Sequence, residues 1–380
     1  MKIIGFETFL VAPRWMFLRI DTDEGVSGWG EPIVEGRAET VRACVTTLLE
    51  RLTGTDPGTI EDHWQTMSKG GFYRGGPVLS SAVAGIDQAL WDIKGKALGV
   101  PVYDLLGGPV RDRVRMYTWI HGDSAAELAD DAAAKAAAGY TAVKFTPSRQ
   151  LPHLPSADAV RGIAERVAAV REAVGHAVDI AIDCHGRFST AASRRILPVL
   201  EPYLPLFAEE PVLPEYARDL GRVAAGTTIP IATGERLFSR WDFRDVLGTG
   251  IAVAQPDLSH AGGISEVRRI AAMAEAHDVA VAPHCPLGPI TLAASLHVDV
   301  ATPNFLIQEQ SLGEGYAGGG PPEYLLDPAV FAMTDGHIPR PTGPGLGIEV
   351  DETAVRRAAE LGHAWRNEVW RHRDGAFAEW

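Results

Sequence analysis

The N-terminal part of the chain passes from β-rich runs to helical patterns. Within residues 1–32, KIIGFETFLV and WMFLRIDT are rich in β-formers, and the turn sequence DEG precedes VSGWGE. This order predicts a small antiparallel meander. Helical patterns follow in three segments: one from Thr40, one after Asp56-Pro57, and one over residues 78–98. In the third helix the apolar face indicates plain core packing, with Trp91 as an anchor.

From residue 113 onward, short apolar runs alternate with alanine-rich helical segments. The runs occupy residues 114–120, 142–145, 178–185, 206–211, 229–235, 253–258, 279–285 and 306–310. Ser124 and Glu127 predict a capping box at the first intervening helix, and Gly139 predicts its end. Eight strands, each followed by a connection that can hold a helix, favour a parallel (β/α) barrel whose last repeat is irregular.

The same patterns divide the chain into three parts. We expect a capping domain over residues 1–112 and a barrel over residues 113–315. The turn-rich segment 316–380 should return to the capping domain.

Composition narrows the class of protein. The 380 residues are 46% hydrophobic and 22% charged, which is typical of a soluble globular protein with a large core. A net charge of −14 with no basic stretch argues against a nucleic-acid or anionic-membrane partner. Cys44, Cys184 and Cys285 are widely spaced, which indicates reduced thiols in a cytoplasmic enzyme. Soluble enzymes of this kind are commonly homo-oligomers.

Neither targeting nor membrane insertion is expected. The first 15 residues read as a strand rather than a signal peptide. Apolar runs are all shorter than the ~20 residues that a membrane-spanning helix needs.

Three carboxylates end three consecutive predicted strands at equal intervals: Asp183, Glu209 and Glu235. The carboxyl ends of barrel strands meet at one rim, where these acids would repel one another without a counter-ion. A hard divalent cation removes the conflict, and Mg²⁺ fits oxygen ligands best. The alternative is that each acid caps a helix or pairs with a lysine, but their succession favours the metal. Glu210 should point away from this face by strand alternation.

Two histidines flank the same rim. His185 follows the third strand and His284 ends the seventh, and these strands lie opposite one another in a closed eight-stranded barrel. A bound molecule would meet one imidazole from each side, which suits one acid and one base. Asp257 could orient His284, and Glu309 ends the neighbouring eighth strand. The sequence offers no such setting for three other histidines: His153, His176 and His260.

These motifs resemble the enolase superfamily and, within it, the mandelate racemase-like acid-sugar dehydratases, with the galactonate dehydratases most similar. The matching stretches include PRWMFLRIDTDEGVSGWGEP (13–32), GFYRGGPVLSSAVAGIDQALWDIKGKALGVPV (71–102), HGR (185–187), EEPVL (209–213), GERLFSRWDF (234–243), QPDLSHAGGISE (255–266), APHCPLGP (282–289) and QEQSLG (308–313). The similarity continues to WRNEVWRH near the C-terminus and so covers nearly the whole chain.

The resemblance implies a modified (β/α)8 barrel, (β/α)7β, with an α+β capping domain built from both termini. It implies Mg²⁺ ligands at the three carboxylates Asp183, Glu209 and Glu235. His284 would be the base that removes the proton α to a carboxylate, with Asp257 as its partner. His185 would be the acid that helps the 3-hydroxyl leave, and Glu309 would hydrogen-bond the enediolate intermediate.

The second strand departs from related enzymes. Relatives that use a lysine base carry K-x-K there, whereas Lys144-Phe145-Thr146 keeps only the first lysine. A lysine base is therefore disfavoured. The galactonate dehydratases carry asparagine and glycine where Thr146 and Pro147 stand, which leaves the identity of the sugar open. Lys144 either adds positive charge near the substrate or serves as a structural lysine of the barrel interior.

Two loops of the predicted capping domain offer contacts for a polyol. PRWM contributes Arg14 and Trp15, and GFYRGGP contributes Tyr73 and Arg74 between glycines that permit motion. Ordinary domain-interface contacts are the alternative for all four.

Together these features predict Mg²⁺-dependent dehydration of a small-molecule acid sugar, D-galactonate to 2-dehydro-3-deoxy-D-galactonate. A neutral His284 and a protonated His185 would give a bell-shaped pH profile. The alternatives are a dehydratase for gluconate or mannonate, a racemase or epimerase of the same superfamily, and a non-catalytic binding protein that keeps the barrel.

Overall fold

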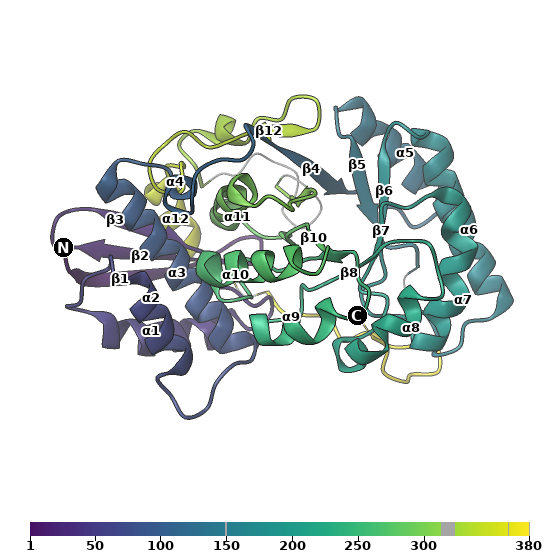
Figure 1. Cartoon of the computed structure of the whole chain (residues 1–380), viewed down its shortest axis with the longest axis horizontal. Coiled ribbons are helices and arrows are strands. Elements are labelled where there is room, and N and C mark those ends of the chain that lie inside the picture. The colour runs from purple at the N-terminus through teal and green to yellow at the C-terminus, as the bar shows by residue number, and fades with distance from the viewer. Residues whose placement is uncertain (149, 313–323, 364, 380) are drawn as a thin grey trace.

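The computed structural model describes residues 1–148, 150–312, 324–363 and 365–379. The N-terminal part is an antiparallel sheet with helices on one side, at the left of Figure 1. Its strands are β1 (Ile3–Val11), β2 (Trp15–Thr22) and β3 (Ser27–Gly30), which confirms the predicted meander. Its helices are α1 (Ala38–Leu52), α2 (Ile60–Lys69), α3 (Pro77–Leu98) and the short α4 (Val102–Leu105).

Helix α3 packs directly on β3 because glycines leave room for it. A Cβ on Gly30 would lie 1.9 Å from the carbonyl oxygen of Gly85. A larger residue at position 30 would therefore push the strand and the helix apart. Trp91 of α3 is half-buried, and its indole donates a hydrogen bond to the Ser265 hydroxyl (2.9 Å). This side chain therefore ties the N-terminal part to the barrel as well as filling core.

The chain from β4 to β11 forms the predicted (β/α)7β barrel. Its parallel strands are β4 (Arg113–Trp119), β5 (Ala142–Phe145), β6 (Asp179–Asp183), β7 (Phe207–Glu209), β8 (Ile231–Thr233), β9 (Val253–Ala254), β10 (Ala280–Val281) and β11 (Gln308–Glu309). They follow one another around the sheet, and β11 returns to pair with β4. Backbone hydrogen bonds from Val281 to Asn304 and from Leu306 to Val281 close the ring beside β10.

Helices connect successive barrel strands and cover the outer face. They are α5 (Ala125–Ala137), α6 (Ala157–Val174), α7 (Thr190–Leu200), α8 (Leu220–Ala224), α9 (Arg240–Leu247), α10 (Gly263–Glu275) and α11 (Pro289–Ala301), with 3₁₀ turns η1 (Glu201–Tyr203) and η2 (Pro214–Asp219). The capping box at α5 is confirmed, because Ser124 and Glu127 exchange both hydrogen bonds. Gly139, with φ of 96°, ends that helix region as predicted.

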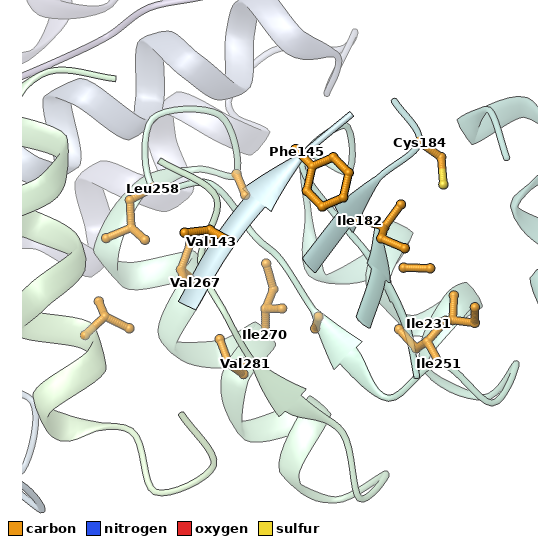
Figure 2. Packing of buried hydrophobic residues seen from close by; sticks show 14 of the residues in the cluster. Val143, Phe145, Ile182, Cys184, Ile231, Ile251, Leu258, Val267, Ile270 and Val281 are labelled. Carbon is orange, nitrogen blue, oxygen red and sulfur yellow. The ribbon is translucent and has the colours of Figure 1, made fainter. Parts of the chain in front are cut away.

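Strand alternation separates an outer core from the barrel interior. Val143 and Ile182 face outward and join Val267 and Ile270 of α10 in the cluster of Figure 2. The interior holds one buried residue from each barrel strand or its extension: Tyr117, Ala142, Ala181, Phe207, Ala232, Val253, Ala282 and Ile307. Two residues later along a strand, the side chain again faces inward but one layer higher. That layer carries the chemistry.

The segment after the barrel contacts both parts. Strand β12 (His337–Pro339) pairs antiparallel with β4, and η4 (Pro328–Phe331) precedes it. Helix α12 (Glu352–Glu360) packs on β1, and Arg356 forms an ion pair with Glu7 (2.6 Å). The predicted boundary between residues 315 and 316 lies outside the described residues. Among the described helices, none combines the length and apolar character needed to cross a membrane.

Candidate active site

The three predicted carboxylates come together at the carboxyl ends of β6, β7 and β8. One oxygen each from Asp183, Glu209 and Glu235 lies within 4.8 Å of the others. Asp183 and Glu209 face each other because they are register partners in neighbouring strands. Glu235 reaches the cluster through a turn at Gly234, where φ is 147°. Glu210 is not part of this trio, and its carboxylate accepts a hydrogen bond from Arg236 (2.6 Å).

Two oxygens of this trio fit a cation. Asp183 Oδ2 and Glu235 Oε2 are buried and accept no hydrogen bond from the residues that the structure describes; their cationic neighbours, Lys144 and His284, lie 3.3 and 3.4 Å away. A buried carboxylate oxygen without a donor is costly, and a divalent ion with oxygen ligands would satisfy both. The residues present therefore fit a hard divalent cation held by the trio.

Lys144 is the counter-ion of the cluster in the absence of a metal. Its fully buried ammonium lies 2.8 Å from Glu209, 2.9 Å from Glu309 and 3.3 Å from Asp183. Burial alone would lower the pKa of this lysine, but the surrounding carboxylates raise it well above its usual value. Lys144 is therefore charged and held inside the barrel, beneath the cavity rather than in its lining.

One ammonium does not balance the acids around it. Burial and then the Asp183 charge raise the pKa of Glu209 well above its usual range. Burial likewise raises the pKa of Glu235 to about 7. Asp183 keeps a lowered pKa of about 2, because the His185 and Lys144 charges outweigh the effect of burial. Without a cation, protons must partly occupy the sites that a metal would take.

The two histidines stand on either side of the trio. His284 donates from Nδ1 to Asp257 Oδ2 (2.8 Å), since Oδ1 of that aspartate already accepts backbone N–H groups at residues 259 and 260. In the neutral ring this bond leaves Nε2 of His284, which lies 3.4 Å from Glu235, as the acceptor. His185 Nε2 lies 3.3 Å from Asp183, and its ring stacks on Trp119.

The protonation states without a metal are the reverse of those expected from the sequence. Burial lowers the pKa of His185 to about 4. Burial also acts to lower the pKa of His284, but the Glu235 and Glu309 charges raise it to about 10. A cation bound by Glu235 would neutralise the charge that protonates His284, so the neutral base depends on the metal.

Glu309 has its oxygens engaged by protein donors. Trp119 and Lys144 donate to Oε1 at 2.7 and 2.9 Å, and the Cys285 backbone N–H donates to Oε2 at 2.9 Å. Burial would raise the pKa of Glu309, yet the Lys144 charge leaves it below its usual value. In this arrangement an ionised Glu309 accepts hydrogen bonds from Lys144 and Trp119, and it would need a proton to donate one to an enediolate. Its role at the enediolate stays a prediction.

A cavity of about 270 Å³ opens above these groups, with His185, Glu235 and His284 in its lining. Of the four predicted polyol contacts, the structure brings only Arg14 to this cavity. Trp15 turns into the core, where it is 5% exposed and packs against Phe17. Tyr73 and Arg74 do not line the cavity, and Tyr73 is 89% exposed.

Several lining residues were missed from the sequence: Glu35, Arg236, His260, Trp365 and Asn367. His260 is 7% exposed and lies 3.4 Å from Glu35. Burial acts to lower its pKa, but Asp257 and then Glu35 raise it to about 9. His260 lies in the SHAGG stretch, and Trp365 and Asn367 lie in the WRNEVWRH stretch, both of which are among the stretches that resemble the enolase superfamily. Only folding brings these residues to the cavity beside His284.

A (β/α)7β barrel with a carboxylate trio between two imidazoles, covered by an α+β domain, defines a class of enzymes that abstract a proton next to a carboxylate. Residues 6–107 match the mandelate racemase/muconate lactonizing enzyme N-terminal domain, and residues 127–354 match the enolase C-terminal domain-like family. The chain belongs to the mandelate racemase/muconate lactonizing enzyme family of the enolase superfamily.

Full-length relatives agree with this assignment. Proteins named D-galactonate dehydratase from Ralstonia nicotianae and from Xanthomonas oryzae pv. oryzae are 53% and 52% identical, each over 100% of both chains. A crystal structure of an enolase from Agrobacterium radiobacter, with Na and L-malate bound, has a TM-score of 0.93 and 35% identity over 100% of both chains.

Proposed function

We propose that this enzyme dehydrates D-galactonate to 2-dehydro-3-deoxy-D-galactonate and water, with Mg²⁺ bound by Asp183, Glu209 and Glu235. The observation that carries the proposal is the carboxylate trio with one imidazole on each side and a cavity above it. The names of the full-length relatives support the choice of substrate. The malate in the Agrobacterium structure supports a hydroxy acid as the kind of ligand.

The chemistry divides between the two imidazoles. A divalent cation held by the trio would supply positive charge beside the substrate carboxylate, where negative charge develops as the α-proton leaves. His284 Nε2 takes the proton from C2, and Asp257 stabilises the imidazolium that forms. The electron pair left on C2 then forms the C2–C3 double bond and expels the 3-hydroxyl. His185 lies on the other side of the trio and is the proposed acid. Because burial lowers its pKa to about 4, this role requires the imidazole to take up a proton from solvent before it protonates the hydroxyl. Water then leaves and the enol becomes a 2-keto acid.

Several finer points belong to the same proposal. Mg²⁺ is favoured over softer ions because the trio offers only carboxylate oxygens. A cytoplasmic location fits the three cysteines, which are free thiols in this structure. We also propose the division into residues 1–112, 113–315 and 316–380, and self-association as a homo-oligomer.

A panel of aldonic acids tests the function. Purified enzyme with Mg²⁺ is incubated with D-galactonate, D-gluconate and D-mannonate, and 2-keto acid is measured with and without EDTA. We expect product from D-galactonate, none with EDTA, and none from His284→Asn or His185→Asn. His277→Asn, on the exposed surface, serves as the control and should keep full activity.

Two outcomes would contradict the proposal. Product from another aldonate but not from galactonate would show that the substrate is wrong. Exchange of the C2 proton with solvent deuterium, without keto acid, would show a racemase or epimerase instead.

A further inference from the structure

The C-terminal segment forms part of the cavity wall. After α12, the chain continues as residues 365–379 from the side of the N-terminal sheet toward α8, in yellow in Figure 1. Trp365, Asn367 and Glu379 line the same cavity as His185 and His284. The end of the chain therefore borders the reacting groups, although it is remote from them in sequence.

This segment is held in place by contacts with both parts of the molecule. The Arg14 guanidinium lies over the Trp365 ring (5.3 Å), and the Arg187 guanidinium lies over Trp370 (4.8 Å). Residues 370–378 form a hairpin, in which His372 and Ala376 are joined by a backbone hydrogen bond and Ala378 is 2% exposed. The fold thus holds Trp365 directly and holds the chain on the far side of Asn367 through Trp370 and the hairpin.

The positions of His284, His185 and the carboxylate trio determine which part of a bound acid sugar reaches the C-terminal segment. C2 and C3 of an acid sugar must lie between His284 and His185, with the carboxylate beside the metal trio. The remaining hydroxyl-bearing carbons then extend toward the rest of the cavity lining. Glu35 lies there, held by His260 and Arg14 at 3.4 and 3.6 Å.

Trp365 and Asn367 offer the chemistry that a polyol needs. The indole ring presents an apolar face to C–H groups, as aromatic residues do in ligand pockets. The Asn367 amide can both donate and accept, which matches a hydroxyl. Asn367 is an exposed residue of the cavity lining and makes no hydrogen bond with any residue that the structure describes, so a ligand hydroxyl can replace solvent at its amide.

We propose that Trp365 and Asn367 bind the carbons beyond C3 of the acid sugar and select substrates by chain length. The inference rests on the proposed function for the orientation of the ligand. It assigns a specificity role to the C-terminal segment in addition to the capping-domain loops.

Binding of two acids of different length tests the inference. Dissociation constants of Mg²⁺-loaded protein are measured by calorimetry for D-galactonate and for the four-carbon aldonate with the same configuration at C2 and C3. Asn367→Ala should weaken D-galactonate by about tenfold, the value of one to two lost hydrogen bonds, and the four-carbon acid by less than about twofold. Trp365→Ala should show the same selectivity with a larger loss, and Trp365→Phe should restore most of the affinity.

Glu368, next to Asn367 in sequence, provides the control for this test. Glu368→Ala changes the exposed neighbour outside the cavity lining and should leave both constants unchanged. Equal losses for both acids, or no loss for either, would overturn the inference. Binding of galactonate without turnover would overturn the proposed function while leaving the length dependence measurable. If neither acid binds the wild-type protein, both proposals fail.

Discussion

The substitution Lys144→Met tests whether the cation-free site depends on a single buried ammonium. Lys144 is fully buried and contacts three carboxylates at 2.8 to 3.3 Å. Removing one partner of a buried ion pair costs about 3–5 kcal/mol, because the remaining charge has no compensation. Unfolding entropy is about 2.1 cal/mol/K per residue, which gives about 0.8 kcal/mol per degree if the 380 residues unfold together. The expected decrease in Tm is therefore about 4–6 °C.

The decrease should depend on pH and on metal. Glu209 and Glu235 already have raised pKa values, and loss of the Lys144 charge would raise that of Glu209 further. An acid with a raised folded-state pKa contributes stability below its unfolded pKa and loses it as pH rises. The variant should therefore lose more stability at pH 8 than at pH 5. Added Mg²⁺ should raise its Tm more than that of the wild type, because the ion meets one extra uncompensated charge.

Calorimetric or fluorescence melting in EDTA and in Mg²⁺, at both pH values, provides the measurement. Lys2→Met, at an exposed position, is the matched control and should change Tm by less than about 1 °C. The reasoning is refuted if Lys144→Met melts like the wild type in EDTA. It is also refuted if Mg²⁺ gives both proteins the same increase.

Three further predictions address the base, the metal and the fold. Asp257→Asn should lower kcat by about 10²–10⁴-fold with little change in KM. An amide group that donates to His284 Nδ1 moves the ring N–H to Nε2, so that Nε2 can no longer accept a proton. Steady-state kinetics will show whether kcat falls while KM stays the same. Mg²⁺ affinity should fall as pH drops below about 7, because Glu235 then holds a proton that the ion must displace. Calorimetry in two buffers of different ionisation enthalpy would detect the released proton. A constant affinity from pH 5 to 8 would contradict this prediction. Ser124→Ala should cost about 1 kcal/mol by removing the cap of α5, a Tm decrease of about 1 °C with activity unchanged.

Much of the fold was predictable because local patterns specify it. The eight apolar runs coincide with the parallel strands, and Ser124 with Glu127 placed the start of α5. The clustering of the three carboxylates was also predictable, since strand ends of a barrel share one rim and Asp183, Glu209 and Glu235 end successive strands or the turns after them.

Other features depended on contacts that no local pattern carries. From its sequence Lys144 could be a substrate contact or a structural lysine. Only the fold shows its ammonium buried in ion pairs with Asp183, Glu209 and Glu309. Trp15 and Arg14 are adjacent, yet Trp15 enters the core as the first residue of β2, whereas Arg14 lies in the turn between β1 and β2 and lines the cavity.

The sequence by itself determined the barrel, the acids at its rim and the two imidazoles, because strand period and strand ends are local properties. The tertiary structure alone decided the far wall of the cavity, where Glu35, His260 and the C-terminal Trp365 meet from distant parts of the chain. It also decided the charge states, since pKa values follow burial and the distances between groups, which folding sets.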